Sequence, residues 1–301
     1  MFALTILGSN SAIPAHGRNP TSQVLQTQDN NFLIDCGEGA QMQLAKYKIK
    51  TSKISHIFIS HLHGDHYFGL IGLLSSMSLL NRTQDLHLFG PALLEDIILL
   101  QCKASLSEFT YKIHFHSLGE NGIIAETNKM NISSFKVDHQ IDCWGFLFKE
   151  KKKPRAIDAE KVKSFEIPAS FYEALQKGEN YITKNGAVIQ NEEVTIPNTA
   201  PRTYAYCADT IYKESLIPVI KDVDLLYHES TYLKDQEDKA SARYHSTTEQ
   251  AAKIAKMANV KQLIIGHFSS KYDDITPFLE EAKEIFDNSI LAIEGACYYV
   301  R

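Results

Sequence analysis

The stretch HIFISHLHGDHYFGL, residues 56–70, places four histidines and one aspartate within its first eleven positions. Its opening run, HIFIS, predicts a buried β-strand. Three of the histidines and the aspartate then follow the carboxyl end of this strand, and Gly64 among them permits a tight backbone turn. The pattern therefore predicts a strand that delivers several polar side chains to one small region.

The residue types in this turn are those of a metal site. Imidazole nitrogens and carboxylate oxygens bind zinc or manganese, and alternation over a tight turn lets two side chains face one ion while their neighbours face a second. We interpret His61, His63, Asp65 and His66 as part of a two-metal site. The alternatives at this point are a histidine-rich surface loop and a single structural zinc site.

Other predicted strands also end next to a metal-capable residue. ISSFKVD precedes His139, TYAYCA precedes Asp209, and KQLIIG precedes His267. Because sites in α/β sheets form at the carboxyl ends of strands, we expect these ends to converge on one crevice. Each residue taken singly is compatible with an ordinary surface position, but their repeated placement favours metal ligands.

The composition indicates a globular α/β chain of 301 residues with a formal net charge of −5, so a nucleic-acid partner would need a local basic patch. Five cysteines without a Cys-x-x-Cys pair indicate reduced thiols. The apolar segments are too short for a signal peptide or a membrane span. We therefore expect a cytoplasmic protein that does not enter a membrane.

Strand-like and helix-like runs alternate along the chain. Helices are expected over 66–80, 91–106, 169–177, 247–258 and 277–287. Ser246 and Glu249 predict a capping box ahead of the fourth helix, and ILAIEGACYYV, residues 290–300, is expected to form one strand. We expect a single domain over 1–301.

The segment from about 149 to 197 differs from its surroundings. It opens with the basic run KEKKKPR and carries turn signals at Lys177-Gly178 and Asn185-Gly186. Such a run is ordinarily a solvated loop, but Lys149, Lys151, Lys152, Lys153 and Arg155 can also bind phosphates without reading sequence. We interpret the segment as an insertion that projects from the core as an arm.

The ordered motifs SHLHGDHYFGL, VDHQIDCWGF, CADT, HEST, YHSTTEQAA and GHFSSKY closely resemble the ribonuclease Z family of the metallo-β-lactamase superfamily, from residue 3 to about 300. The resemblance implies an α/β fold, a four-layer αββα sandwich, with an inserted arm. It also implies two zinc ions per subunit, with manganese as a possible substitute. The implied ligands are His61, His63 and His139 for one ion, Asp65, His66 and His267 for the other, and Asp209 as a bridge.

The resemblance further implies an endoribonuclease that removes the 3′ trailer from precursor tRNA after the discriminator nucleotide and leaves a 3′ hydroxyl on the tRNA. His245 is the expected proton donor, because it precedes a predicted helix start where an anionic phosphate is favoured. Glu229 is expected to orient His245. Asp65 is expected to act both as a ligand and as a general base.

The first loop, GSNSAIPAHGRNPTSQ, resembles the family loop that lies near the RNA end, so Arg18 and Asn19 are expected to contact substrate. The resemblance also implies that the arm grips tRNA and that the protein is a homodimer. FEIPASFYEALQKGE stands where many relatives have a Gly-Pro-rich stretch, which leaves the conformation of the arm open. The rival functions are a small-molecule phosphodiesterase, a thioester or lactone hydrolase, and a nucleic-acid-binding subunit on a scaffold that has lost its activity.

Overall fold

The computed structural model describes residues 2–300, and internal contacts divide the chain into two compact units. The first unit runs to Thr127, continues over Asn131–Phe148 and resumes at Arg202. The second unit comprises Asn128–Met130 and Lys149–Pro201. Its longer segment thus begins where the basic run of the sequence begins.

Two seven-stranded sheets form the centre of the first unit. One has the order β18-β1-β2-β3-β4-β5-β6, with strands Cys297–Tyr299, Phe2–Gly8, Ser22–Thr27, Asn31–Cys36, Ile54–Phe58, Leu86–Gly90 and Ile113–Ser117. The other has the order β17-β16-β15-β14-β9-β8-β7, with strands Ser289–Leu291, Gln262–Gly266, Leu225–Glu229, Thr203–Cys207, Trp144–Glu150, Met130–Lys136 and Gly122–Glu126. Strands β3 to β6 run parallel, as do β14 to β17. The carboxyl ends within each parallel set therefore lie at one edge.

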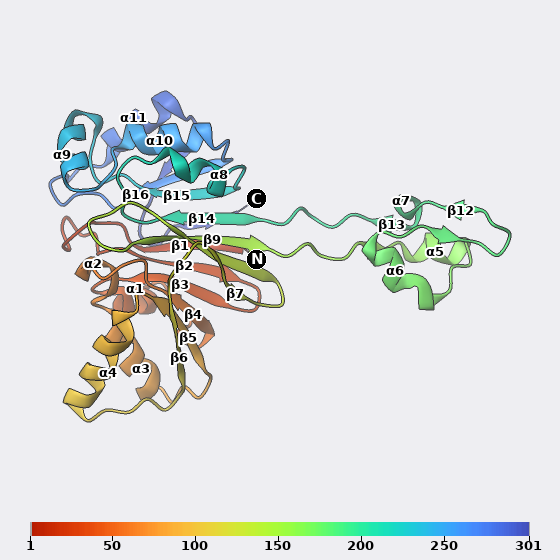
Figure 1. The fold of residues 1–301 in the computed structure, drawn as a ribbon, viewed down its shortest axis with the longest axis horizontal. Helices are drawn as coiled ribbons and strands as arrows, with labels where there is room; N and C mark the ends of the chain where they lie inside the picture. The colour runs from red at the N-terminus through yellow and green to blue at the C-terminus, as the bar shows by residue number, and fades with distance from the viewer. Residues whose placement is uncertain (1, 301) are drawn as a thin grey trace. The chain divides into compact units, whose positions relative to one another are not determined.

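Helices cover the outer face of each sheet (Figure 1). The first sheet carries α1 (Ala40–Lys46), α2 (Gly64–Tyr67), α3 (Leu70–Leu79) and α4 (Leu93–Ser105), and the second carries α8 (Ile217–Ile220), α9 (Glu237–Ala242), α10 (Thr248–Met257) and α11 (Thr276–Ile285). Short 3₁₀ turns lie at Thr51–Lys53, Glu214–Leu216 and Lys234–Gln236. The expected αββα sandwich is confirmed.

Aromatic rings fill the space between the two sheets. Phe58 of β4 lies 5.3 Å from Phe146 and 5.4 Å from Phe148 of β9, measured between ring centroids, and the Phe32 ring is 5.8 Å from Phe148. All four side chains are almost fully buried. Packing of this kind fixes one sheet against the other and so fixes the relative positions of their strand ends.

Three details differ from the sequence predictions. The helix expected over 66–80 is two helices, α2 and α3, and at the break an added Cβ on Gly69 would lie 2.2 Å from the Gly37 carbonyl oxygen. The strand expected over 290–300 is also two, β17 and β18, which belong to different sheets. Gly295, with φ 82°, turns the chain between them.

The predicted capping box is wrong by one residue. Thr247 is the N-cap of α10: its hydroxyl accepts from the Gln250 amide, and the Gln250 side chain accepts from the Thr247 amide. Ser246 is fully buried and donates to the Thr210 carbonyl oxygen at 2.7 Å. Ser246 therefore joins the helix to another loop, which leaves the cap to its neighbour.

The second unit has a small core of its own. Its elements are β10 (Ala156–Ile157), α5 (Ala159–Ser164), a 3₁₀ turn at Ala169–Phe171, α6 (Tyr172–Lys177), β11 (Tyr181–Ile182), β12 (Val188–Ile189), α7 (Asn191–Val194) and β13 (Thr195–Ile196). The buried apolar side chains are Val162, Ile167, Leu175, Ile189 and Val194. Both predicted turns are confirmed, since Gly178 and Gly186 have φ of 99° and 82°. Within residues 2–300, no helix combines the length and apolar character needed to cross a bilayer.

Candidate metal centre

Strand ends from both sheets deliver the predicted ligands to one place. His61 and His63 lie in the loop after β4, Asp65 and His66 in α2, His139 after β8, Asp209 after β14, and His267 directly after β16. They form two groups, His61-His63-His139-Asp209 and Asp65-His66-His267, in each of which the ligand atoms lie within 4.8 Å of one another. The structure thus brings together all seven residues, grouped as the family resemblance implies.

In the first group, three ring nitrogens and one carboxylate oxygen face a common centre. The Nδ1 atom of His63 lies 3.1 Å from His61 Nε2 and 3.1 Å from His139 Nε2. Asp209 Oδ2 lies 3.7 Å from His61 Nε2 and 3.8 Å from His139 Nε2. Such a set of nitrogen and oxygen donors is typical of a transition-metal site.

The second group has the same character and shares Asp209. The Nε2 atoms of His66 and His267 lie 3.3 Å apart, and Asp65 Oδ2 lies 3.6 Å from the first and 3.4 Å from the second. Asp209 Oδ1 lies 3.5 Å from His66 Nε2 and 3.2 Å from His267 Nε2. Because its two oxygens face different groups, Asp209 occupies the position that a bridging ligand needs.

The state of Asp209 tests whether the cluster fits metal ions. Its side chain is 3% exposed, and Oδ1 is buried without a hydrogen-bond partner. Burying an unpaired carboxylate oxygen is costly unless a cation compensates it. The donors and this oxygen together fit divalent metal ions.

The ring nitrogens that face away from the centre are anchored. His66 Nδ1 lies 2.7 Å from Asp35 Oδ2, and the Asp35 carboxylate also accepts from the Ser60 amide and from the Tyr206 hydroxyl. The corresponding partners of the other rings are Thr231 Oγ1 for His267 at 2.8 Å, the Tyr244 carbonyl oxygen for His139 at 2.9 Å, and Ser60 Oγ for His61 at 3.0 Å. Partners of this kind fix the orientation of metal-binding imidazoles.

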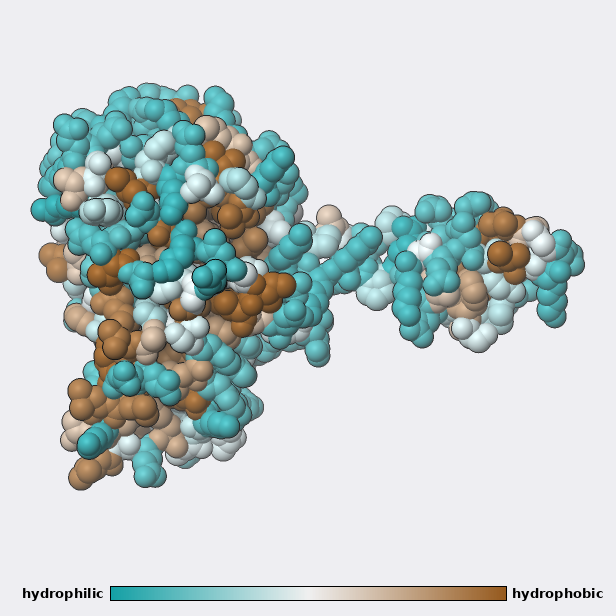
Figure 2. All heavy atoms as spheres, in the orientation of Figure 1, coloured by the Kyte–Doolittle hydropathy of each residue, from teal (hydrophilic) through white to brown (hydrophobic). Residues whose placement is uncertain are grey.

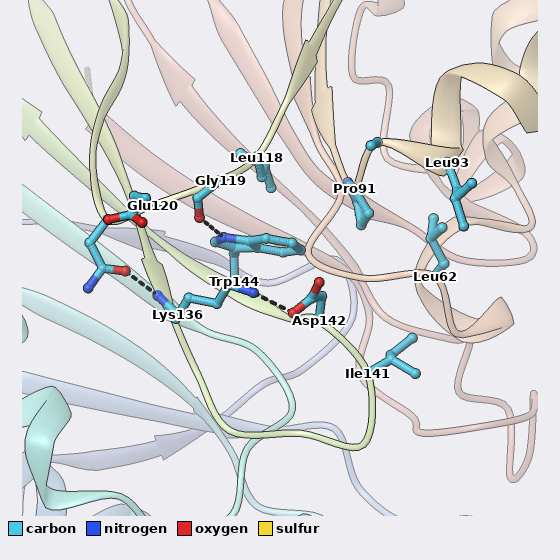
Figure 3. A pocket seen from close by; sticks show the side chains of 12 residues that line it. Leu62, Pro91, Leu93, Leu118, Gly119, Glu120, Lys136, Ile141, Asp142 and Trp144 are labelled. Atoms are coloured by element: carbon cyan, nitrogen blue, oxygen red, sulfur yellow. Dashed lines mark hydrogen bonds and ion pairs between the residues drawn. The ribbon is translucent and has the colours of Figure 1, made fainter.

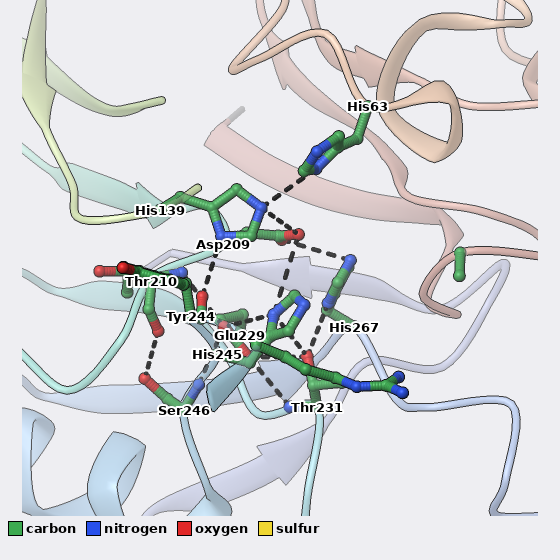
Figure 4. A network of polar contacts seen from close by, with 12 residues as sticks. His63, His139, Asp209, Thr210, Glu229, Thr231, Tyr244, His245, Ser246 and His267 are labelled. Carbon is green, nitrogen blue, oxygen red and sulfur yellow. Dashed lines mark hydrogen bonds and ion pairs between the residues drawn. The ribbon is translucent and has the colours of Figure 1, made fainter. Parts of the chain in front are cut away.

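His245 forms a pair with Glu229 beside the cluster (Figure 4). Its Nδ1 lies 3.0 Å from Glu229 Oε1, and Glu229, which is fully buried, also accepts from the amides of Thr210, Thr231 and Ser246. Burial opposes a charged imidazole, but the Glu229 and Asp209 carboxylates raise the pKa of His245 to about 9. The two carboxylates therefore favour the protonated form of His245.

A cavity of about 420 Å³ opens onto these groups and contains residues that the sequence analysis missed. Arg243 lines it and offers a positive charge, and Phe68 lines it with a side chain that is 64% exposed. Ser269 and Ser270 add hydroxyls. Their positions in the sequence could have indicated them, because Arg243 stands two positions before His245 and Phe68 stands two positions after His66.

Arg18 and Asn19 do not line this cavity. The Arg18 guanidinium donates to the carbonyl oxygens of Tyr272 and Asp273 and to Asn10 Oδ1, while Asn19 donates to Glu294. Ser11 and Ala12 of the same loop reach the cavity, and the Ala12 amide donates to Asp65 Oδ2 at 2.7 Å. Arg18 and Asn19, which were predicted to contact substrate, therefore hold the first loop in place in the structure.

The predicted basic residues belong to the second unit. Lys149, Lys152 and Lys153 are exposed, and Lys151 is half-buried. Arg155 donates through Nε to Thr195 Oγ1 at 2.6 Å. The exposed lysines present positive charge to solvent, whereas Arg155 stabilises the unit internally.

Comparisons with known proteins agree with this geometry. The family model described as anti-Pycsar protein Apyc1 matches residues 2–153. The chain is 43% identical over 298 residues to ribonuclease Z of Bacteroides fragilis, covering 98% of each chain, and 45% identical over 302 residues to ribonuclease Z of Cytophaga hutchinsonii, covering 99% of this chain and 96% of that one.

Solved structures extend the agreement to the fold. The short form of human tRNase Z matches with a TM-score of 0.72 and 26% identity over 99% of both chains. A metallo-β-lactamase fold protein from Bacillus subtilis matches with a TM-score of 0.69 and 20% identity, over 99% of this chain and 100% of that one, and so shares the fold.

Two packed sheets with histidine and aspartate groups at their shared edge define a metal-dependent hydrolase of the metallo-β-lactamase fold. Identity above 40% extends over nearly the whole chain. The chain belongs to the ribonuclease Z family, and it is a metal-dependent endoribonuclease.

Proposed function

We propose that this protein removes the 3′ trailer from precursor tRNA in the cytoplasm, by hydrolysing the phosphodiester after the discriminator nucleotide. The tRNA keeps a 3′ hydroxyl and the trailer a 5′ phosphate. The observation that supports the proposal is the cluster of seven candidate ligand side chains beside the His245–Glu229 pair, in a chain 43% identical to a ribonuclease Z.

The proposed cofactors are two zinc ions per subunit, for which manganese could substitute, because histidine and carboxylate donors discriminate weakly between these metals. His61, His63 and His139 would hold one ion, Asp65, His66 and His267 the other, and Asp209 both. When bound, such a pair lowers the pKa of water and neutralises charge on a phosphodiester.

The chain's own groups supply the proton transfers. Asp65 accepts a proton from the attacking water, and it is ionised because, although burial opposes this, His66 and His267 hold its pKa below the usual range. His245, protonated and held by Glu229, donates its proton to the departing 3′ oxygen. Arg243 in the same cavity favours binding of a phosphate.

The second unit is proposed to bind the body of the tRNA. Its exposed Lys149, Lys152 and Lys153 follow one another closely in a chain of net charge −5. Contacts between lysines and phosphates give affinity without sequence discrimination, which suits an enzyme that accepts many tRNAs.

The proposed assembly is a homodimer. Figure 2 shows apolar side chains gathered over α3 and α4. The exposed leucines within α3 and α4 and just after them are Leu79, Leu80, Leu93, Leu99, Leu100 and Leu106. A patch of this kind indicates a protein–protein contact, and analytical ultracentrifugation of the purified protein tests whether two copies associate.

The deciding experiment uses purified, zinc-loaded protein and 5′-labelled precursor tRNA with a 3′ trailer, and the product length is read at single-nucleotide resolution. We expect one cut after the discriminator nucleotide and none with Asp209→Ala, which removes the shared ligand. Intact precursor would reject the proposal.

The rival function is hydrolysis of a small phosphodiester, a thioester or a lactone on the same scaffold. The family model for Apyc1 matches residues 2–153, so the match includes only the beginning of the segment Lys149–Pro201. The rival function likewise would not need the second unit. Parallel assays with bis(p-nitrophenyl) phosphate, a thioester and a lactone distinguish the two, since rapid turnover of any of them alongside intact precursor supports the rival.

A further inference from the structure

The helix α9 ends in a turn that contributes three consecutive residues to the metal centre and its cavity. Arg243 and His245 line the cavity. The carbonyl oxygen of Tyr244, which stands between them, lies 2.9 Å from His139 Nδ1 (Figure 4). His139 is a candidate metal ligand, and His245 is the proposed proton donor. One turn of the chain therefore contacts both kinds of group.

The hydrogen bonds of this turn are those of a Schellman motif. The His245 amide donates to the Ala240 carbonyl oxygen at 2.9 Å, and the Tyr244 amide donates to the Ser241 carbonyl oxygen at 3.1 Å. The residue that follows the C-cap in this motif has a left-handed backbone and is usually glycine. Here it is Tyr244, with φ of 57°. Because a bulky side chain disfavours this region, the turn keeps a conformation that its own residue opposes.

The left-handed backbone decides where the two functional groups point. A right-handed backbone at Tyr244 would continue the helix, and its carbonyl oxygen would point along the helix axis. Instead, this oxygen faces His139, and the chain turns so that His245 meets Glu229 and the cavity. A change of backbone at this one position would therefore displace both groups.

The loop that carries His139 is also held at its ends. Lys136 and Asp142 form an ion pair across it, and both line a second cavity of about 870 Å³ (Figure 3). This pair restrains the loop but does not involve the imidazole of His139. On the side away from the other ligands, the ring is oriented by the Tyr244 carbonyl oxygen.

We propose that Tyr244 is a positioning residue whose left-handed backbone orients His139 and His245 together. The backbone rather than the side chain has this role, since Tyr244 is 41% exposed and its carbonyl oxygen makes the contact. The part that concerns His245 rests on the proposed function. The part that concerns His139 requires only that the centre binds metal.

The test changes the backbone preference at position 244. Tyr244→Gly and Tyr244→Asn accept a left-handed backbone, whereas the β-branched side chain of Tyr244→Val opposes it more strongly than tyrosine does. The matched control is Lys48→Val. Lys48 follows α1, has the same φ of 57° and is exposed, so this variant imposes the same strain outside the metal centre.

Zinc affinity tests the part that concerns His139. We expect Tyr244→Val to bind one of its two zinc ions about 10- to 100-fold more weakly, the usual loss when the partner of a metal-binding imidazole is removed. Tyr244→Gly, Tyr244→Asn and Lys48→Val should match the wild-type protein. Competition with a chelator of known affinity measures this, and thermal unfolding shows whether each variant is folded.

Two results would overturn the proposal at His139. One is an unchanged zinc affinity in folded Tyr244→Val. The other is a weakened affinity in Tyr244→Gly or Tyr244→Asn, which would show that the side chain matters rather than the backbone. The second result is decisive even if Tyr244→Val does not fold.

Two substrates then separate the ligand from the proton donor. With enough zinc to fill the centre, Tyr244→Val should hydrolyse bis(p-nitrophenyl) phosphate at the wild-type rate, because its leaving group departs without a proton. Its kcat for precursor tRNA should stay at least about tenfold lower, since a displaced His245 no longer protonates the 3′ oxygen. Recovery of both activities would overturn the role at His245. Intact precursor with the wild-type protein would reject the proposed function, and the zinc affinities would still decide the role at His139.

Discussion

At the scale of the residue, the reactivity of His245 depends on one buried carboxylate. Glu229 is fully buried and makes its contacts with backbone amides, with Thr231 and with His245, so it has no freedom to turn away. The imidazole that it holds is 15% exposed and faces the catalytic cavity. Because Nδ1 of His245 faces Glu229, the imidazole can donate a proton to substrate only on the side that faces the cavity.

Replacing His245 tests whether it transfers that proton. We expect His245→Ala to lower kcat by 10²- to 10⁴-fold, the usual contribution of a general acid. Zinc content, measured by mass spectrometry on the same preparation, should equal that of the wild-type protein. Loss of metal would show that His245 is a ligand, which its proximity to Asp209 and His267 makes a meaningful alternative.

The pH dependence of turnover tests the role of Glu229. The pKa of His245 is raised to about 9 against the effect of burial, so the acid is protonated below that pH and lost above it. Glu229→Gln removes the negative charge, and the alkaline limb of kcat should move to lower pH by at least one unit. Thermal unfolding and zinc content control for a structural effect, and an unmoved limb would contradict the assignment.

The clustering of the seven candidate ligands could be predicted from sequence because most of them follow a strand end, but their hydrogen-bond partners could not. Ser246 resembled a helix cap, whereas the structure uses it to join Thr210 and Glu229. Arg18 resembled a phosphate contact, whereas its guanidinium donates to carbonyl oxygens. Which polar atoms a side chain meets depends on loops distant in sequence, and a single sequence does not encode that directly.

At the scale of the element, strands β4, β5 and β6 carry a row of stacked histidines. The His56 ring lies 4.9 Å from His87, and His87 lies 4.9 Å from His114 and 5.2 Å from His116, with interplanar angles of 19°, 17° and 24°. His56 opens the stretch that also supplies the ligands, yet it lies in this row and not in the metal centre.

This row makes stability depend on pH. Burial, together with His87 and His116, lowers the pKa of His56 from 6.5 to about 4, so the unfolded chain takes up the proton first as the pH falls. Stability should therefore decrease between about pH 6.5 and pH 4.

His56→Phe keeps a ring in the row and cannot bind the proton. At pH 5 it should be more stable than the wild-type protein by up to roughly 2 kcal/mol, relative to their difference at pH 7.5. Urea unfolding of both proteins at the two pH values measures this. A difference that does not change with pH would refute it.

Helices and strands also differ in how far local sequence alone predicts them. The predicted helices at 91–106 and 247–258 appear as α4 and α10 because apolar periodicity is local. Strands β2, β6, β7 and β9 were not predicted. β6, with IHFHS, alternates histidine with apolar residues, and its stacking partners on β5 decide its pairing.

At the scale of the whole molecule, the two units divide the proposed work. The ligands, His245 and both cavities belong to the first unit, and the exposed lysines belong to the second, which has its own core. The charge and the turn signals of this segment predicted an insertion. Its short elements, such as β10 and α7, were not predicted, because contacts within the unit stabilise them rather than local propensity.

Deleting residues 150–196 tests the division. We expect kcat/KM for precursor tRNA to fall at least 100-fold, because phosphate contacts supply much of the affinity for RNA. Hydrolysis of bis(p-nitrophenyl) phosphate should be preserved, since no ligand is removed. Equal loss of both activities would contradict a role in recognition, and zinc content shows whether the remaining unit is intact.

The spread of the ligands over both sheets has a consequence for biosynthesis. No fragment of the growing chain that ends before His267 holds the full set, and ligands from 61 to 267 meet only when both sheets have packed together. A nascent nuclease is surrounded by messenger and transfer RNA. Because His267 follows β16, such a chain cannot cleave these RNAs through the complete centre until that strand has been made and has joined its sheet.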